Sequence, residues 1–414
     1  MRPIGFPNFP FDSPLTGTIV DLERVRGDLG LGDTHPALFE QLRSMAQLMS
    51  TITSARIEGN RASIVRAVAA VDASRRHPAT HHPDDVQDIV QLDAATAFVD
   101  RTVTSGTLLT HGFVRELHRM CVQGLKREGD RTPGAYRTSN ITIGGSRHVP
   151  PPPSSIHGDL SELLGFLNKD VAHHIQLLKI AVAHHRFVWI HPFANGNGRV
   201  GRLLTYAAMR REGYTDDSGY RFLNPTAVFG NDLALYYERL GDADSLEPDA
   251  IVRWCEFMLS GLVAELERMR SLSHHDFAVR GVFVPAIRQG QRGALLDQAD
   301  AHALAMVAER LDVRAADLEP AYPGSPAVRS RKIRSLLDRG LVEATTPSGR
   351  IYRLRLAPSE LTPLVFRQLD EIGFLPRILR DEQPHAEMPP VSENAPRRSA
   401  GQIPKPGAGP AGGG

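Results

Sequence analysis

The amino-acid sequence predicts a mainly α-helical protein that carries a short β-hairpin flap and a smaller C-terminal α+β domain. Three observations support this fold class. Across residues 36–275, apolar residues recur every three or four positions, which is the spacing of one face of an α-helix. The segment 134–153 differs, because it combines β-branched residues with a Gly-Gly turn and a run of prolines. Residues 295–356 contain two helical patterns followed by two strand patterns.

The N-terminal region is expected to start as extended backbone and to continue as helices. Residues 1–35 begin with a stretch rich in Pro and Gly, which disfavours helix. Between Pro36 and Glu58 the apolar residues form one helical stripe, which ends at Gly59. The members of this stripe are Leu38, Leu42, Met45, Met49 and Ile52. Helical patterns continue to residue 103 across one polar loop, so residues 36–103 form a predicted N-terminal helical region.

Residues 104–275 form the predicted core domain. Helical spacing continues to about residue 125 and resumes at residue 155, after the flap. This later helix should end near His191, because a residue that precedes a proline is biased away from helical backbone. A second strong helical pattern begins near Gly198, and further helices are expected over 231–240 and 247–274.

Residues 290–380 are predicted to be a separate domain, whose two helices and hairpin resemble a winged helix. Basic residues gather on its second helix and on the hairpin, namely Arg329, Arg331, Lys332, Arg334, Arg350, Arg353 and Arg355. They make DNA a candidate partner of residues 325–355, although protein docking or a solvated basic face would explain the same charges. Residues 385–414 are rich in Pro and Gly and are expected to be disordered.

The composition sets limits on location and partners. The 414 residues carry a formal net charge of +1, so no overall field attracts nucleic acid or a membrane. Two cysteines are too few for a disulfide framework. The sequence contains no apolar run of the length that crosses a membrane, and its N-terminus does not resemble a secretion signal. We therefore expect a cytoplasmic protein without membrane contact.

The stretch HPFANGNGRVGR, residues 191–202, has the composition of a phosphate-binding loop. Small residues let backbone N–H groups approach an anion, and the start of a helix attracts negative charge. Arg199 and Arg202 add positive charge beside that helix start, and His191 can act as a general base near neutral pH. The glycines also match a dinucleotide-binding fingerprint, but that motif requires a preceding strand, whereas here the preceding residues have a helical pattern. A plain Gly-rich turn with surface arginines is the remaining alternative.

This stretch resembles the signature of the Fic domain family, H-x-F-x-[DE]-G-N-G-R-x-x-R, at every specified position except Asn195. The flap segment GAYRTSNITIGGSRHVPPPP is similar to the family's target-docking hairpin, and SARIEGN, residues 54–60, matches its inhibitory pattern [ST]-x-x-x-E-[GN]. The resemblance covers about residues 36–275. It implies a Fic-type helical bundle that transfers AMP from ATP to a Ser, Thr or Tyr hydroxyl of a protein target.

The resemblance also implies roles for individual residues. His191 would deprotonate the target hydroxyl, and Phe193 would pack into the core. The α- and β-phosphates would be held by Gly196, Asn197 and Gly198, with Arg199 in support, and Arg202 would bind the γ-phosphate. The target backbone would pair with the flap residues Thr142, Ile143, Gly144, Gly145 and Ser146. Tyr236 and Tyr237 are candidates for the adenine pocket, with a core tyrosine pair as the alternative.

Asn195 stands where the family usually has an acidic residue that holds Mg²⁺. A neutral amide oxygen is a weaker ligand for a hard cation such as Mg²⁺ or Mn²⁺. We expect reduced metal affinity, a different metal preference or slow turnover. Asn195 is either a tolerated variant or a sign of a site altered towards another substrate or towards inactivity.

Ser54 and Glu58 are four residues apart and therefore share one helix face. The resemblance implies that Glu58 reaches Arg202 and prevents productive binding of the γ-phosphate, with Ser54 in support, so that the enzyme inhibits itself. The alternative is a solvated residue at a helix end. In some relatives the same glutamate positions a water molecule that removes AMP, which leaves the reverse reaction open here.

Three functions are therefore distinguished: an AMP transferase restrained by its own helix, a nucleotide-binding regulator that acts through the winged-helix domain, and a transferase of another nucleotide. A homodimer is left open. His173, His174, His184 and His185 are expected to be packing or surface residues, because the sequence has no HExxH motif or cysteine-rich partner for a metal.

Overall fold

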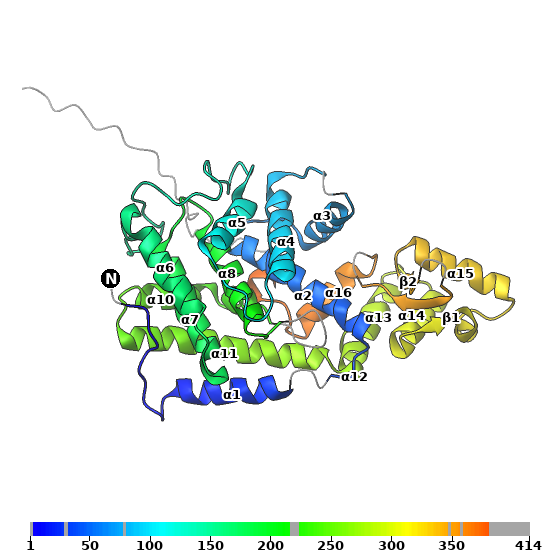
Figure 1. Cartoon of the computed structure of the whole chain (residues 1–414). Helices are drawn as coiled ribbons and strands as arrows, with labels where there is room; N and C mark the ends of the chain where they lie inside the picture. Colours follow the sequence, from blue (N-terminus) through cyan, green and yellow to red (C-terminus); the bar gives the residue numbers. More distant parts are fainter. Residues whose placement is uncertain are drawn as a thin grey trace, which may run out of the picture.

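The computed structural model describes residues 3–28, 32–77, 80–215, 223–346, 349–356 and 359–380. Helices dominate these residues and pack around one continuous hydrophobic core (Figure 1). The predicted disordered tail, 385–414, lies outside the described residues. None of the helices in the described residues is long and apolar enough to cross a membrane.

Three helices build the predicted N-terminal helical region. They are α2 (Pro36–Ile57), α3 (Ile64–Arg76) and α4 (Asp84–Thr102). The imidazole of His35 accepts a hydrogen bond from the Ala37 amide, which caps the start of α2. After α2 the chain turns at Gly59, whose φ of 88° is the left-handed conformation that glycine adopts most easily. The predicted helix and its predicted end are confirmed.

The centre of the molecule is a group of helices in which α7, α9 and α10 pack on a long helix, α11. The elements are α5 (His111–Val122), α6 (Ile156–Leu167), α7 (His173–Ile190), α8 (Asn197–Arg211), α9 (Thr226–Asn231), α10 (Leu233–Ala243) and α11 (Pro248–Leu272), with a 3₁₀ turn at Pro153–Ser155. At Gly201, α8 lies against α7 so closely that a Cβ atom would come within 3.1 Å of the Phe187 ring. This close contact fixes the two helices that meet at the predicted phosphate-binding loop.

The prediction of an extended N-terminal segment over residues 1–35 is wrong for residues 14–28. Residues 14–28 form helix α1 (Pro14–Asp28), which runs along α11 (Figure 1). Leu15, Leu22 and Val25 are buried along one side of α1. Burial of this short apolar stripe against α11 outweighs the weak local helix signal that the neighbouring prolines and glycines give.

The predicted β-hairpin flap is not a hairpin in the structure. Residues 138–152 contain no strand and form a loop with one tight turn, in which the Ser146 amide donates to the Ile143 carbonyl at 3.2 Å. The β-branched residues of this segment are Thr138, Ile141, Thr142, Ile143 and Val149. Two short arms without a facing sheet gain too little from pairing with each other to form a stable ladder.

The C-terminal domain contains the predicted helices and strands. It comprises α12 (His275–Phe277), a π-helical turn (Ala278–Phe283), α13 (Val284–Arg292), α14 (Gln298–Arg310), β1 (Val313–Arg314), a 3₁₀ turn (Ala315–Leu318), α15 (Pro326–Asp338), β2 (Val342–Ala344) and β3 (Ile351–Leu354). The sheet has the order β1-β3-β2, with both pairs antiparallel. The winged-helix assignment and the domain boundaries stay predictions, and residues 347–348 of the predicted turn lie outside the described residues.

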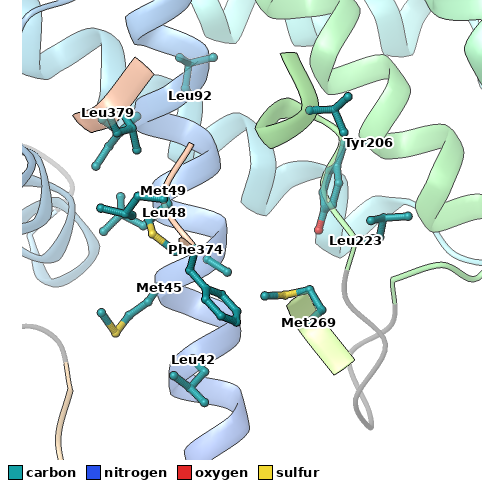
Figure 2. Close-up of a cluster of buried hydrophobic side chains, with 14 of the residues drawn as sticks. Leu42, Met45, Leu48, Met49, Leu92, Tyr206, Leu223, Met269, Phe374 and Leu379 are labelled. Atoms are coloured by element: carbon teal, nitrogen blue, oxygen red, sulfur yellow. The ribbon is translucent and has the colours of Figure 1, made fainter. Parts of the chain in front are cut away.

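The chain then returns to the helical core. Helix α16 (Thr362–Glu371) packs on α13, and α17 (Arg377–Arg380) packs on α2 and α9. Figure 2 shows Phe374 and Leu379 of this returning segment in the same cluster of buried side chains as Met45, Leu48 and Met49 of α2. The last described residues therefore cover the helix that carries Ser54.

Candidate active site

The loop 191–196 joins the C-terminal end of α7 to the N-terminal end of α8. His191 has the left-handed backbone conformation, with φ of 49°, and the proline after it prevents further helix. The Arg137 guanidinium donates to the His191 carbonyl at 2.8 Å and to the Ile190 carbonyl at 3.4 Å. Arg137 thus pairs with carbonyl groups that the end of a helix leaves without intrahelical partners, and it holds the turn in place.

The His191 ring is oriented by a backbone carbonyl. Its Nδ1 donates to the Val188 carbonyl at 3.1 Å, because a carbonyl oxygen can only accept. In the neutral ring this contact places the proton on Nδ1 and the lone pair on Nε2. Nε2 is therefore the atom that can accept a proton from a substrate.

Phe193, His118 and Asn197 hold the loop from the inside. Phe193 is fully buried, as predicted, and stacks on the His118 ring with 3.8 Å between the ring centroids. His118 also donates from Nε2 to the Asn195 carbonyl at 3.1 Å, while its Nδ1 accepts from the Gly134 amide. Burial lowers the pKa of His118 to about 4, so the ring stays neutral near neutral pH.

The side chain of Asn197 closes the loop. It accepts from the Phe193 amide and donates to the Phe193 carbonyl, both at 2.9 Å. The amide group of this side chain is therefore used within the protein, so Asn197 can contribute to a phosphate site only through its backbone. The predicted cradle of Gly196, Asn197 and Gly198 is accordingly a backbone feature.

Helix α8 begins in the geometry of an anion site. Gly196 has φ of 77°, and a Cβ atom there would lie 2.7 Å from Val122, so only glycine fits. Gly198 lies in the first turn, where backbone N–H groups lack intrahelical partners and the helix dipole is positive. A Cβ atom on Gly198 would lie 2.3 Å from the Glu58 carboxylate and 3.1 Å from Arg202. The space above the start of α8 is thus occupied by a carboxylate of the protein itself.

Ser54 and Glu58 hold Arg202 with three hydrogen bonds. Arg202 donates from Nε to the Ser54 hydroxyl at 2.8 Å, and from Nη2 to the Ser54 carbonyl at 3.1 Å and to the Glu58 carboxylate at 2.6 Å. Burial raises the pKa of Glu58, but nearby Arg202, Arg199 and His191 lower it to below its usual range. Glu58 is therefore ionised at neutral pH. The predicted contact between Glu58 and Arg202 is present in the structure.

Arg199 lies at the start of α8 but points into the protein, and its predicted support of the phosphates stays a prediction. Its guanidinium is buried and donates to Asp88 at 2.9 Å, to the Glu128 carbonyl at 2.7 Å and to the Cys121 carbonyl at 3.3 Å. A side chain three residues from Arg202 points about 60° away from it around the helix, and here that direction leads into α4 rather than into the site. Arg199 therefore fixes the start of α8, and a direct contact with phosphate requires exposure that it lacks.

Asn195 has both ends of its amide engaged. Its Nδ2 donates to the Gly129 carbonyl at 3.1 Å, and its Oδ1 accepts from the Gly196 amide at 2.6 Å. The described residues contain no group of three or more His, Cys, Asp or Glu side chains arranged to hold a metal ion. Asn195 thus stabilises the loop. An ionised carboxylate at this position could not do the same, because a carboxylate cannot donate a hydrogen bond to the Gly129 carbonyl.

Tyr236 and Tyr237 lie beside the inhibitory pair. Tyr236 is buried, and its hydroxyl contacts Nε2 of His184 at 3.2 Å. Burial raises the pKa of Tyr236 to about 12, and nearby Arg202 opposes that rise. Burial raises the pKa of Tyr237, and the nearby Glu58 carboxylate raises it further, so this ring is close to the site as well. Tyr236 is a core residue, whereas the half-buried Tyr237 remains a candidate for contact with a nucleotide.

The other histidines are packing or surface residues, as predicted. His184 and His185 are buried, and they contact Thr205 and Asp244 respectively. His173 and His174 are exposed at the start of α7.

The five predicted flap residues lie on a loop that is anchored to the active site. Thr142, Gly144, Gly145 and Ser146 are exposed, and Ile143 is half-buried. His148 contacts the Trp189 carbonyl at 2.7 Å, and Arg137 donates to the Pro151 carbonyl at 2.5 Å. The backbone of the flap is thereby held next to His191 without a strand partner among the described residues.

Sequence reasoning missed Arg137, His118 and Asp88, which position the site. Each acts through contacts between segments far apart in the chain, and none belongs to a spacing pattern that a single sequence reveals. A weak signal existed for His118, because it lies on the buried side of the predicted helix with Leu117 and Cys121.

The chain is similar to known proteins over this region. A model described as the Fic/DOC family matches residues 108–209. A protein adenylyltransferase Fic from Aedes aegypti is 33% identical over 191 residues, which are 44% of this chain and 36% of that protein. One from Nematostella vectensis is 28% identical over 192 residues, which are 45% of this chain and 41% of that protein. The chain thus spans well under half the length of these relatives. The crystal structure of a Fic family protein from Desulfovibrio desulfuricans G20 shares the fold, with a TM-score of 0.52 and 23% identity over 84% of this chain and 98% of that one.

Proposed function

Residues 108–209 form a Fic domain, and from this premise we propose that the protein transfers AMP from ATP to a hydroxyl group of a protein target. The observation that carries the proposal is the position of the Glu58 carboxylate, which lies over the start of α8 and pairs with Arg202. A place that holds one anion, beside helix amides and an arginine, suits the phosphates of a nucleotide. The names of the curated relatives support the same reaction.

In the proposed reaction, His191 takes the proton of the target hydroxyl while the hydroxyl oxygen attacks the α-phosphorus of ATP. A bond forms between this oxygen and phosphorus. The bond from the α-phosphorus to the bridging oxygen breaks, and pyrophosphate leaves. The contact of Nδ1 with the Val188 carbonyl supports this role, because it leaves the lone pair of the neutral ring on Nε2. The backbone amides of the α8 start would stabilise the charge on the phosphates, and Arg202 would bind the γ-phosphate.

Autoinhibition follows from competition for Arg202. While Arg202 donates to Ser54 and Glu58, its guanidinium is not available to a γ-phosphate. The Glu58 carboxylate also fills the space over Gly198 and would repel a phosphate that approached it. ATP can therefore bind productively only when Glu58 moves away.

A divalent cation fits the residues of this site poorly. Asn195 stands at the place of the family's acidic ligand, and both ends of its amide are engaged with Gly129 and Gly196. Mg²⁺ or Mn²⁺ would have to take its ligands mainly from the phosphates of ATP and from water.

The test compares four proteins: wild type, Glu58→Gly, His191→Ala and the double variant. Each is incubated with ATP labelled at the α-phosphate, with Mg²⁺, with Mn²⁺ or with EDTA. We expect labelled protein only with Glu58→Gly, and none with the double variant. Calorimetry that detects no nucleotide binding by Glu58→Gly would refute the proposal.

The same experiment separates the alternatives. Binding of ATP without transfer would favour a nucleotide-binding regulator. Preferential labelling from GTP, CTP or UTP would identify another nucleotide as the substrate. Loss of label from a modified target on addition of wild type, but not of Glu58→Gly, would reveal the reverse reaction.

We also propose DNA binding as a second function, carried by the outward side of α15. Arg331 and Arg334 are exposed there. Two other basic residues of the predicted set are engaged with carboxylates, Lys332 with Asp297 and Arg353 with Asp312, so the positive surface is smaller than the sequence suggests. Duplex DNA should bind in a salt-dependent manner, and Arg331→Ala with Arg334→Ala should reduce the salt slope by about 2. The absence of a mobility shift at low salt would contradict this function.

The cytoplasmic location and the homodimer stay predictions. Fractionation of cells and light scattering of the purified protein test them directly.

A further inference from the structure

We infer that the described residues between 341 and 380 clamp the inhibitory helix α2, so that the contact between Glu58 and Arg202 depends on the C-terminal part of the chain. We call these residues the C-terminal clamp. The inference rests on the proposed function, because the pair that the clamp controls is the inhibitory one. Two contact points carry it, one near each end of α2.

The first contact point is Gln41, in the N-terminal half of α2. Its Nε2 donates to the Leu354 carbonyl at 3.0 Å, and its Oε1 accepts from the Leu356 amide at 2.8 Å. Nε2 also lies 3.4 Å from the carboxylate of Glu343. One side chain thus pairs with a donor and an acceptor at the end of β3 and reaches β2 as well. Such a two-sided amide contact fixes both the position and the rotation of α2 against the hairpin.

The surroundings of Gln41 are tightly packed. His35 and Leu38 face Val307, Leu311 and Leu354 across a slot. The centre of a water-sized sphere can occupy only about 10 Å³ of this slot. A space of this size holds about one water molecule. The N-terminal half of α2 therefore cannot slide along the C-terminal domain without breaking these contacts.

The second contact point lies directly behind the inhibitory motif. A Cβ atom on Gly230 of α9 would lie 2.4 Å from Thr53 and 3.0 Å from Ile378 of α17, so these three residues meet at one point. Thr53 immediately precedes Ser54, whose hydroxyl accepts from Arg202. Helix α17 thus packs against α2 and α9 one residue away from Ser54.

A helix that is held at two points behaves as a rigid unit. Gln41 and Glu58 are 17 residues apart, which corresponds to about 25 Å at 1.5 Å per residue. Figure 2 shows the apolar side chains Met45, Leu48 and Met49 between these points, packed with Phe374 and Leu379 of the clamp. If the clamp contacts exist only while α2 is in the inhibitory position, their loss raises the population in which Glu58 has left Arg202.

The test uses two variants of the full-length chain and two matched controls. Gln41→Glu keeps the size of the side chain but places a carboxylate against the Leu354 carbonyl and Glu343. Gly230→Ala inserts a methyl group where Thr53 and Ile378 meet. The controls are Glu40→Gln, a charge change on the same helix without a described clamp contact, and Gly241→Ala, where a Cβ atom has open space.

Two measurements are made on each protein. Hydrogen exchange of peptides from residues 46–58 reports the opening of α2 without any nucleotide, and calorimetry reports the affinity for ATP. We expect faster exchange and roughly 5- to 50-fold tighter ATP binding for both variants, within the usual range of coupling between distant sites. The controls should behave like wild type. In the Glu58→Gly background, Gln41→Glu should leave ATP affinity unchanged, because both substitutions would act on the same equilibrium.

The outcomes separate the clamp from the proposed function. Unchanged exchange and unchanged ATP affinity in both variants, while Glu58→Gly binds ATP tightly, would overturn the clamp alone. A full additional gain from Gln41→Glu in the Glu58→Gly background would also overturn it. If Glu58→Gly itself binds no ATP, the proposed function fails, and the exchange of residues 46–58 still decides whether α2 is held by residues 341–380.

Discussion

Substitution of Glu58 by glutamine separates the charge of the inhibitory side chain from its shape. Glutamine has nearly the same size, so it still fills the space over Gly198. It can accept a hydrogen bond from Arg202 but cannot form an ion pair with it. In the wild-type structure this ion pair spans 2.6 Å, and the exposed fractions of the side chains are 2% for Arg202 and 21% for Glu58.

The expected gain in ATP affinity follows from the attraction between two opposite charges, because the Arg202 donor is charged in both proteins and only the charge of the acceptor is lost. This attraction contributes up to about 1 kcal/mol in an exposed ion pair and more in a buried one. Since Arg202 is buried and Glu58 is partly exposed to water, we expect a loss of about 1–2 kcal/mol. This weakening of the inhibitory contact corresponds to roughly 5- to 30-fold tighter binding of ATP. Glu58→Gly removes charge and volume together and should bind more tightly still.

Isothermal calorimetry with ATP on wild type, Glu58→Gln and Glu58→Gly measures both contributions. The expected order of affinity is Glu58→Gly, then Glu58→Gln, then wild type. If Glu58→Gln binds ATP no more tightly than wild type while Glu58→Gly does, inhibition is steric and the electrostatic reasoning is wrong. If all three bind ATP equally, Glu58 does not inhibit at all.

Other predictions concern pH, buried charge and metal. The folded protein lowers the pKa of Glu58, so the stability that its ion pair contributes should be fully present above the usual carboxyl pKa and be lost as pH falls through the pKa of Glu58 in the folded state. Below that pH, wild type and Glu58→Gln should have the same thermal stability. Asp88→Asn removes the nearest counter-charge of the buried Arg199, which should cost about 3 kcal/mol and lower the melting temperature of this chain by about 3–4 °C in calorimetry. His118 resists protonation, with a pKa of about 4, so it should destabilise the protein by about 3 kcal/mol between pH 6.5 and 4, and His118→Gln should flatten this pH dependence in urea unfolding. Asn195→Asp should raise the affinity of the ATP complex for Mn²⁺, measured by electron paramagnetic resonance, and unchanged affinity would remove Asn195 from the metal argument.

Much of the fold could be predicted because its helices carry regular apolar stripes. The stripe from Leu38 to Ile52 gave α2 and its end at Gly59, and Pro192 gave the end of α7. The contact of Glu58 with Arg202 was predicted from the resemblance to the Fic family, because the spacing of Ser54 and Glu58 by itself shows only that they share one helix face. Local patterns suffice where one helix or one loop decides the geometry.

Features that depend on a neighbour far away in the chain could not be predicted in this way. Helix α1 is stabilised by α11, which follows it by more than two hundred residues, and its own apolar stripe is short. The flap residues have the composition of strands, but strands need a partner, and the described chain supplies none there. The ion pair of Arg199 with Asp88 could not be predicted, because spacing places a side chain around a helix without saying which neighbour it meets.

The two arginines of α8 form ion pairs with two different neighbouring helices, and these ion pairs differ in strength. Arg199 joins α8 to α4 through Asp88, with both side chains almost wholly buried, so breaking this pair would leave the buried guanidinium with only the more distant Glu128 carboxylate, 3.9 Å away, as an ion-pair partner among the described residues. Arg202 joins α8 to the end of α2 through Glu58, which water reaches in part, so this pair can open at a smaller cost. Release of α2 would therefore leave the start of α8 and the His191 loop in place. Because the inhibitory helix α2 is held to α8 by the weaker ion pair, it can move away without disturbing the phosphate site that it covers. A reversible switch requires this arrangement.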